Sequence, residues 1–152
     1  MLLQDIFRPE SIKTDLEANN KDELFEELAD CFSRDKKTNR KEILSALKKR
    51  EAKMSTCIQK GVAIPHGKTA AVESVLGVLG ISRKGVDYDS LDGEPVYVLF
   101  ALVAPEKDTE SQLKILKRLA ALLDNPQFLP DLQAQNNAEE VCRLICKYEL
   151  GK

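Results

Sequence analysis

Val96 to Ala104 form one continuous apolar segment, which ends at Pro105. A strand with one face in water alternates apolar and polar side chains, and this segment does not alternate. It is therefore expected to be a strand that is covered on both faces. A second apolar segment, Val75 to Ile81, is rich in β-branched residues and is expected to be a strand of the same sheet.

The helices that would cover such a sheet begin at four similar signals. In each, a residue whose side-chain oxygen can accept a backbone N–H is followed three positions later by Glu or Gln, and then by apolar residues at helical spacing. The pairs are Asn20 with Glu23, Asn39 with Glu42, Thr109 with Gln112, and Asn137 with Glu140. These signals predict two helices before the strands and two after them.

Two weaker strands complete the expected fold. Gly61 to Pro65 is expected to be one strand, and Ser11 to Leu16 another near an edge, while Pro126 and Pro130 break the segment that follows the third helix. The order helix, helix, strands, helix, helix predicts an α/β domain, with a single mixed β-sheet flanked by helices on both faces.

Composition restricts the class of protein. The 152 residues suffice for one core, and no repeat or linker divides them, so residues 1–152 are expected to form a single domain. A net charge of −2 gives no electrostatic reason to expect nucleic-acid binding, and no apolar segment is long enough for membrane insertion. The N-terminus lacks a secretion signal, so we expect a cytoplasmic protein.

The four cysteines, Cys31, Cys57, Cys142 and Cys146, are expected to remain thiols in a reducing compartment. Cys142 and Cys146 lie four residues apart on the expected terminal helix. A metal site would need more ligands at close spacing. We therefore expect these cysteines to be small buried apolar side chains, and we expect no metal.

His66 is the only histidine of the chain. It follows the apolar segment from Gly61 to Pro65 and precedes Gly67, which predicts a position where a strand passes into a loop. An imidazole can act as a neutral nucleophile near pH 7 without a shifted pKa, and it is a good phosphoryl acceptor in that form.

The residues around His66 suit a phosphoryl group. Arg50, at the end of the second helix, can supply a planar charged fork, Ser55 and Thr56 can supply hydroxyl donors, and Lys68 adds a cation. Each residue also has a purely structural interpretation. His66 can be a satisfied structural residue, Arg50 can favour the negative end of its helix, and the two hydroxyls can be ordinary turn residues.

The pattern resembles a known family. Arg50-Glu51, Ser55-Thr56 and the segment from Gly61 to Gly67 are similar to the signature of enzyme IIA domains of the fructose–mannitol type, from the bacterial phosphoenolpyruvate-dependent phosphotransferase system. Two further blocks agree: Leu91 to Pro105 resembles the turn and central strand of the family, and Gln112 to Ala120 resembles its following helix. The similarity covers nearly the whole chain.

The resemblance implies a role for each matching residue. His66 matches the histidine that takes a phosphoryl group from the carrier protein HPr and passes it on, in sugar uptake to a cysteine of a IIB domain. Arg50 matches the arginine that faces the phosphohistidine, and Ser55 and Thr56 match the adjacent hydroxyl pair. The resemblance implies transfer between two protein nucleophiles without a cofactor.

Two positions depart from the family pattern. Family members usually carry a second histidine where this chain has Gln112, whose amide can donate a hydrogen bond to a phosphoryl oxygen but cannot carry a charge. Gln112 also fits the third position of a capping box, which is a wholly structural role. The glycine-rich link of the family is here Cys57 to Gly61, which predicts a stiffer and bulkier loop.

Two functions fit these expectations equally well. One is a phosphocarrier in sugar uptake with a IIB domain as acceptor, and the other is a free-standing regulator of the nitrogen-linked type, which binds target proteins in one phosphorylation state. A third interpretation is a relic that keeps only the fold, and the presence of Arg50, Ser55, Thr56 and His66 together argues against it.

Overall fold

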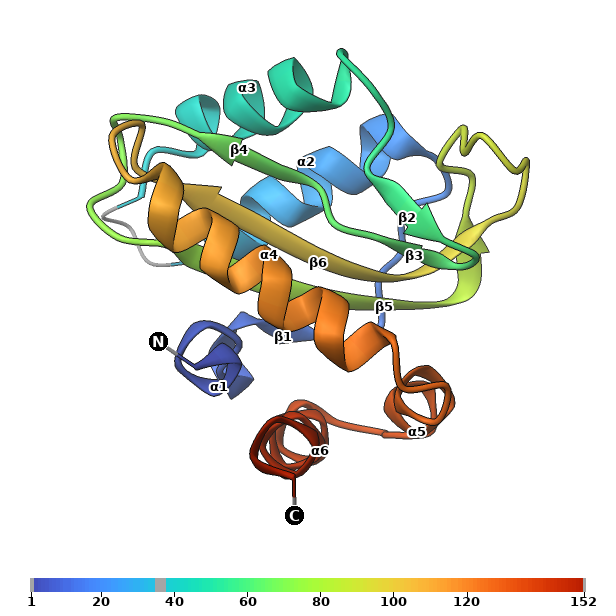
Figure 1. Cartoon of the computed structure of the whole chain (residues 1–152). Helices are drawn as coiled ribbons and strands as arrows, with labels where there is room; N and C mark the ends of the chain where they lie inside the picture. Colours follow the sequence, from blue (N-terminus) through green and yellow to red (C-terminus); the bar gives the residue numbers. More distant parts are fainter. Residues whose placement is uncertain (1, 35–37, 152) are drawn as a thin grey trace.

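The central element of the fold is β6 (Val96–Ala104), in which all but Tyr97 is buried. The structure is a computed structural model that describes residues 2–34 and 38–151. Within these ranges β6 belongs to one mixed sheet of six strands with the order β1-β5-β6-β3-β2, and β4 also pairs with β6 (Figure 1). The strand expected to be covered on both faces is therefore confirmed.

The other strands are arranged around β6. β5 (Leu76–Val86) pairs with it antiparallel, whereas β3 (Val62–Ala63) and β4 (His66–Lys68) follow one another along its other side in parallel. β1 (Ile12–Lys13) pairs with β5 and β2 (Cys57–Gln59) pairs with β3, so both are edge strands. No described strand covers the outer side of β4, which leaves His66 at an open edge of the sheet.

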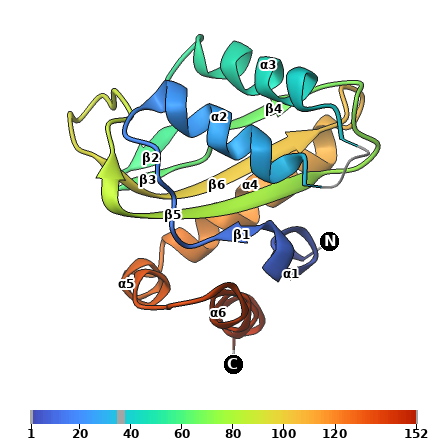
Figure 2. The same ribbon diagram turned by 180° about the vertical axis from the view of Figure 1, so that it is seen from behind.

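Helices cover both faces of the sheet, as predicted (Figures 1 and 2). One face carries α2 (Lys21–Phe32) and α3 (Arg40–Glu51), and the other carries α1 (Leu3–Ile6), α4 (Thr109–Leu123), α5 (Phe128–Gln133) and α6 (Ala138–Leu150). A short 3₁₀ helix, η1 (Pro9–Ser11), precedes β1. The chain is therefore an α/β domain with two separate apolar cores.

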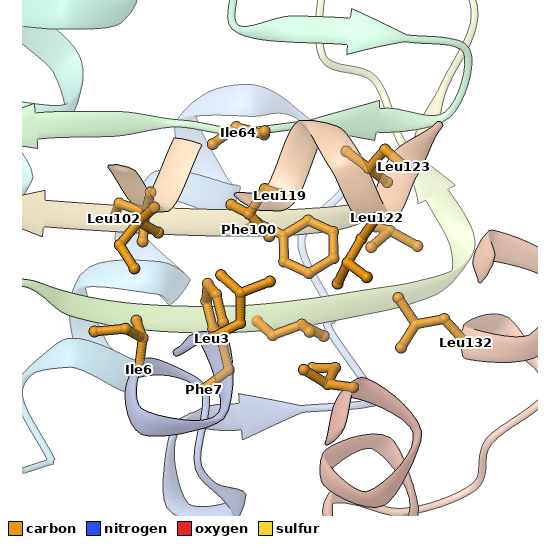
Figure 3. Close-up of a cluster of buried hydrophobic side chains, with 14 of the residues drawn as sticks. Leu3, Ile6, Phe7, Ile64, Phe100, Leu102, Leu119, Leu122, Leu123 and Leu132 are labelled. Atoms are coloured by element: carbon orange, nitrogen blue, oxygen red, sulfur yellow. The ribbon is translucent and has the colours of Figure 1, made fainter. Parts of the chain in front are cut away.

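The core on the α4 side joins residues from both ends of the chain. Phe7 from the N-terminal segment meets Phe100 of β6 edge to face, with ring centroids 5.6 Å apart. Leu119 and Leu122 of α4 and Leu132 of α5 fill the space beside them (Figure 3). Aromatic rings in this geometry contribute roughly 0.5–1.5 kcal/mol beyond the area that they bury.

Three of the four predicted helix starts are confirmed. Asn20, Asn39 and Asn137 each accept the backbone N–H of the Glu three residues later. The fourth prediction is wrong by one residue. Asp108, not Thr109, caps α4 and accepts the backbone N–H of Ser111, since an aspartate is a stronger acceptor at this position than a threonine.

The expected strand from Gly61 to Pro65 is present as β3 but is shorter, and a separate strand that was not expected follows it. β3 ends at Ala63, and β4 begins at His66, which is paired with Leu102 of β6. His66 therefore begins a strand, and the prediction that it lies where a strand passes into a loop is wrong. Pro65 has no N–H to donate, but its carbonyl accepts the N–H of Leu102, so the chain resumes its pairing with β6 directly after the proline.

Other segments differ from the expectation for local reasons. β5 extends to Val86, with a register irregularity after Ile81, because its polar end still lies along β6. Pro126 precedes α5, but Pro130 lies in its first turn, where a missing N–H costs nothing. The link from Cys57 to Gly61 is not a loop alone, since its first three residues form β2, and Gly61 turns the chain with φ of 83°.

Candidate functional site

A pocket of about 360 Å³ opens between the C-terminal half of α3, the edge strand β4 and the start of α4. Its lining consists of Ala46, Lys49, Arg50, Lys53, His66, Gly67, Lys68, Glu106 and Gln112. Four of these side chains are cations and one is a carboxylate. The pocket therefore favours an anionic group beside the imidazole.

The ring of His66 is held in one orientation. It is half-buried, and its Nδ1 lies 2.8 Å from the carbonyl oxygen of Ile64. A carbonyl can only accept a hydrogen bond, so Nδ1 carries the proton. In the neutral ring Nε2 then holds a free lone pair, and this is the nitrogen available as a nucleophile. The backbone carbonyl of Ile64 is thus the acceptor that fixes the tautomer.

The surroundings keep this ring neutral. Burial lowers the pKa of His66 below its ordinary value of 6.5, the charges of Arg50 and Lys68 lower it further, and the bond to Ile64 and the charge of Glu51 oppose the shift. A lowered pKa means that the uncharged, nucleophilic ring predominates at neutral pH.

We therefore expect the protein to lose its nucleophilic histidine only below pH 6.5. As the pH falls through the lowered pKa, Nε2 becomes protonated and its lone pair is lost. Because His66 is the only histidine, an NMR titration of its ring protons follows this group alone. A midpoint below 6.5 is expected, and a midpoint at or above 6.5 would contradict the proposed role of burial and of the neighbouring cations.

Arg50 lies in the last turn of α3 and is half-buried. Its Nη1 donates to the carbonyl of Met54 at 3.0 Å, which leaves other N–H groups of the guanidinium for a ligand. Lys68 also lines the pocket, and its Nζ donates to Oγ1 of Thr109 at 2.7 Å. The structure thus brings Arg50, Lys68 and His66 to one pocket, although they come from different elements.

Gln112 is only 4% exposed and also lines this pocket. Its Nε2 donates to the carbonyl of Gly67 at 3.0 Å. The prediction that Gln112 completes a capping box is wrong, because α4 begins one residue earlier and Ser111 occupies the third position. Its amide has a second hydrogen, so Gln112 can hold the backbone next to His66 and still donate to a bound oxygen.

The predicted hydroxyl pair does not line the pocket. Thr56 is only 3% exposed, and its Oγ1 donates to Oε1 of Glu51 at 2.5 Å. Ser55 is half-buried and its Oγ accepts the N–H of Cys57 at 3.3 Å. Both hydroxyls thus already have hydrogen-bond partners that do not line the pocket.

Sequence reasoning missed a buried polar cluster next to the site. Glu51, Thr56 and Tyr88 contact one another below the protein surface, and Lys21 forms an ion pair with Glu51 at 3.0 Å. Glu51 was part of the family signature, but its burial depends on packing between distant segments. No local pattern in the sequence signals that burial.

Gly67 allows α3 to reach β4. A Cβ atom at this position would lie 2.6 Å from the carbonyl oxygen of Ala46, a backbone atom that cannot turn away. Gly67→Ala is therefore expected to push α3 from β4 and to lower the free energy of unfolding by about 1–3 kcal/mol. Urea unfolding measures this loss, and an unchanged free energy would contradict the close approach of the two elements.

The described ranges contain no candidate metal cluster and no disulfide. No group of three or more His, Cys, Asp or Glu there could hold a metal ion. All four cysteines are free: Cys31 is buried as predicted, whereas the other three are only partly buried, because they lie on faces that the helices and β2 leave open to water. Within residues 2–34 and 38–151, no helix is long and apolar enough to span a membrane.

Comparison with known proteins decides the family. Residues 5–148 match the family described as phosphoenolpyruvate-dependent sugar phosphotransferase system, EIIA 2. The chain belongs to this family. A nitrogen regulatory protein of Bradyrhizobium diazoefficiens is 33% identical over 145 residues, which are 95% of each chain. The fructose-specific EIIABC component of Bacillus subtilis is 31% identical over 150 residues, 98% of this chain but 24% of that longer protein.

Solved EIIA structures agree with the fold. The nitrogen regulatory protein IIA-Ntr from Neisseria meningitidis is 32% identical and superposes with a TM-score of 0.87, covering 94% of this chain and 98% of that one. IIA mannitol of Escherichia coli, solved in complex with phosphorylated IIB mannitol, is 17% identical with a TM-score of 0.77, covering 91% and 96%. The resemblance seen in the sequence is confirmed at the level of the family.

Proposed function

We propose that this EIIA protein is a phosphohistidine carrier, in which Nε2 of His66 accepts a phosphoryl group from an HPr-type protein and passes it to a second protein. The observation that carries the proposal is the bond from His66 Nδ1 to the carbonyl of Ile64, which leaves Nε2 free in a pocket with four cations. Membership of the EIIA family supports a role in phosphoryl transfer.

Transfer to this chain needs no cofactor in the proposed mechanism. The N–P bond of the donor phosphohistidine breaks and its electron pair stays on the donor nitrogen, while the lone pair of Nε2 forms the new bond to phosphorus. The proton of His66 remains on Nδ1, hydrogen-bonded to the carbonyl of Ile64. Arg50 and Lys68 offset the charge of the transferred group, and the second amide hydrogen of Gln112 donates to one of its oxygens. Ser55 and Thr56 make no direct phosphoryl contact in this proposal, because neither lines the pocket.

The proposed function has two forms, which differ in what the phosphorylated protein acts on. In sugar uptake the acceptor is a cysteine of a IIB domain, and the identity of 31% with a fructose-specific relative across nearly the whole chain supports this form. In regulation the phosphorylation state instead controls binding to a target protein. The match to a nitrogen regulatory protein, which covers 95% of both chains, supports the second form.

One assay tests the function and distinguishes its two forms. The protein is incubated with phosphoenolpyruvate, enzyme I and HPr, and then offered a panel of purified IIB domains. Labelling of this chain is expected in either form, and a chain that takes no label overturns the proposal. Onward transfer to a IIB cysteine supports sugar uptake, whereas capture of partners by one phosphorylation state alone supports regulation.

A further inference from the structure

We propose that the buried cluster of Glu51, Thr56 and Tyr88 is a positioning device that orients both His66 and Arg50 for phosphoryl transfer. This inference rests on the proposed function and goes beyond it, because none of the three residues lines the pocket. The charge of Glu51 opposes the lowering of the His66 pKa, but the three residues position the reacting groups only through other residues. Two chains of hydrogen bonds lead from this cluster to the site, one to the imidazole and one to the guanidinium.

The cluster is built around the carboxylate of Glu51, which is 8% exposed. Its Oε1 accepts from Thr56 Oγ1 at 2.5 Å and from the hydroxyl of Tyr88 at 3.1 Å, and the two hydroxyls lie 2.8 Å apart. Its Oε2 accepts from the backbone N–H of Thr56 at 3.1 Å and from Lys21 Nζ at 3.0 Å. Both carboxylate oxygens are thus fully engaged, which a buried charge requires.

Tyr88 ties this cluster to the sheet. Its side chain is fully buried just beyond β5, and Lys21 lies over its ring at 4.6 Å from the centroid. Burial, together with the charge of Glu51, raises the pKa of Tyr88, so its hydroxyl remains a donor. A buried polar cluster within an apolar core therefore joins the start of α2, the end of α3 and the segment after β5.

The first chain of hydrogen bonds leads to the imidazole. The side chain and the N–H of Thr56 are held by Glu51, and its carbonyl accepts the N–H of Ile64 at 2.9 Å. The carbonyl of Ile64 in turn accepts from His66 Nδ1 at 2.8 Å. The orientation and tautomer of the ring thus depend, through Ile64, on where Glu51 holds Thr56.

The second chain of hydrogen bonds leads to the guanidinium. The bond from the N–H of Thr56 to Glu51 closes the turn of residues 52–55 onto the end of α3. Met54 lies within this closed turn, and its carbonyl accepts from Nη1 of Arg50 at 3.0 Å. A shift of Thr56 away from Glu51 would open the turn and release this restraint on Arg50.

A buried ion pair and its hydroxyls contribute little net stability compared with a well-packed apolar cluster. A buried cluster that includes Glu51, the residue after the pocket-lining Arg50, is explained if it orients the site, because misplacement by about 1 Å can slow a reaction by about a hundredfold. A purely structural cluster would instead affect only the fraction of folded protein.

Tyr88→Phe tests the inference, since it removes one hydroxyl and leaves the ring in the core. The matched control is Tyr148→Phe, which also removes a hydroxyl bonded to a carboxylate, that of Asp131, on the other side of the sheet. With HPr-type donor, Tyr88→Phe is expected to lower kcat about tenfold with little change in KM, while Tyr148→Phe keeps the wild-type kcat. The ¹⁵N shifts of His66 should show a mixture of tautomers in Tyr88→Phe alone.

Thr56→Val and Thr56→Ser provide a second test. Valine removes the hydroxyl that bonds Glu51, and serine retains it, so serine should recover most of the kcat that valine loses. A wild-type kcat and a single His66 tautomer in Tyr88→Phe would overturn the inference. Failure of the wild-type chain to take up label would instead overturn the proposed function, so the two failures are distinguishable.

Discussion

His66→Ala is expected to abolish labelling of this chain by phosphoenolpyruvate, enzyme I and HPr. The variant removes the only imidazole of the sequence, and with it the free Nε2 lone pair that the pocket presents. The pocket lining contains no hydroxyl group, and its one carboxylate is that of Glu106. Phosphorylation of Glu106 would give an acyl phosphate, which is chemically distinct from a phosphohistidine. Autoradiography of the gel-separated proteins measures the label.

The control for His66→Ala is a check that the variant still folds. Backbone pairing of β4 with β6 does not use the imidazole, so the circular dichroism spectrum and the urea midpoint should stay close to wild type. A phosphohistidine is labile in acid. Label on the folded variant, or acid-resistant label on the wild-type chain, would show that another residue is the acceptor.

Arg50→Ala is expected to keep the fold and slow phosphoryl transfer strongly. The guanidinium lines the same pocket as His66, and in the proposed mechanism it offsets the charge that develops on the transferred oxygens. Loss of one such electrostatic contact raises the barrier by about 2–4 kcal/mol, which corresponds to roughly 30-fold to 1,000-fold in rate. Rapid-quench measurement of single-turnover transfer from phosphorylated HPr gives this rate directly.

Two further variants separate charge from geometry at Arg50. Arg50→Lys keeps the charge but not the planar fork, so its rate should lie between those of wild type and Arg50→Ala. Lys48→Ala removes an exposed cation from the same helix outside the pocket and should leave the rate unchanged. Equal rates for Arg50→Ala and Lys48→Ala would exclude a role for Arg50 in offsetting charge.

The parts of the fold that follow a long periodic pattern could be predicted from the sequence. The apolar segment from Val96 to Ala104 is β6 with the expected bounds, and the helices that begin after Asn20, Asn39 and Asn137 are present. α1, η1 and α5 were not expected, because helices of three to six residues have too few turns for a repeating apolar pattern to show. The buried apolar residues of α1 and α5 are positioned by packing against α4, α6 and β5 rather than by local preference.

The candidate site also has a part that could be predicted from the sequence and a part that could not. His66 and Arg50 stand out by residue type and by the signature around them, and the structure places both in one pocket. The environment of Thr56 could not be read from its neighbours in sequence, because its hydroxyl turns inward to Glu51 and Tyr88, the latter 32 residues away. Burial of charged and polar side chains is a property of tertiary packing, which no local pattern encodes.

The most direct test of the central claim is the position of the phosphorus on the ring of His66. The ¹⁵N-labelled protein is phosphorylated through HPr, and ³¹P–¹⁵N coupling is measured by NMR, with a single histidine to assign. Coupling to Nε2 is expected, with the proton still on Nδ1 opposite the carbonyl of Ile64. Phosphorus bonded to Nδ1, or to any atom outside this ring, would contradict the proposed role of Nε2.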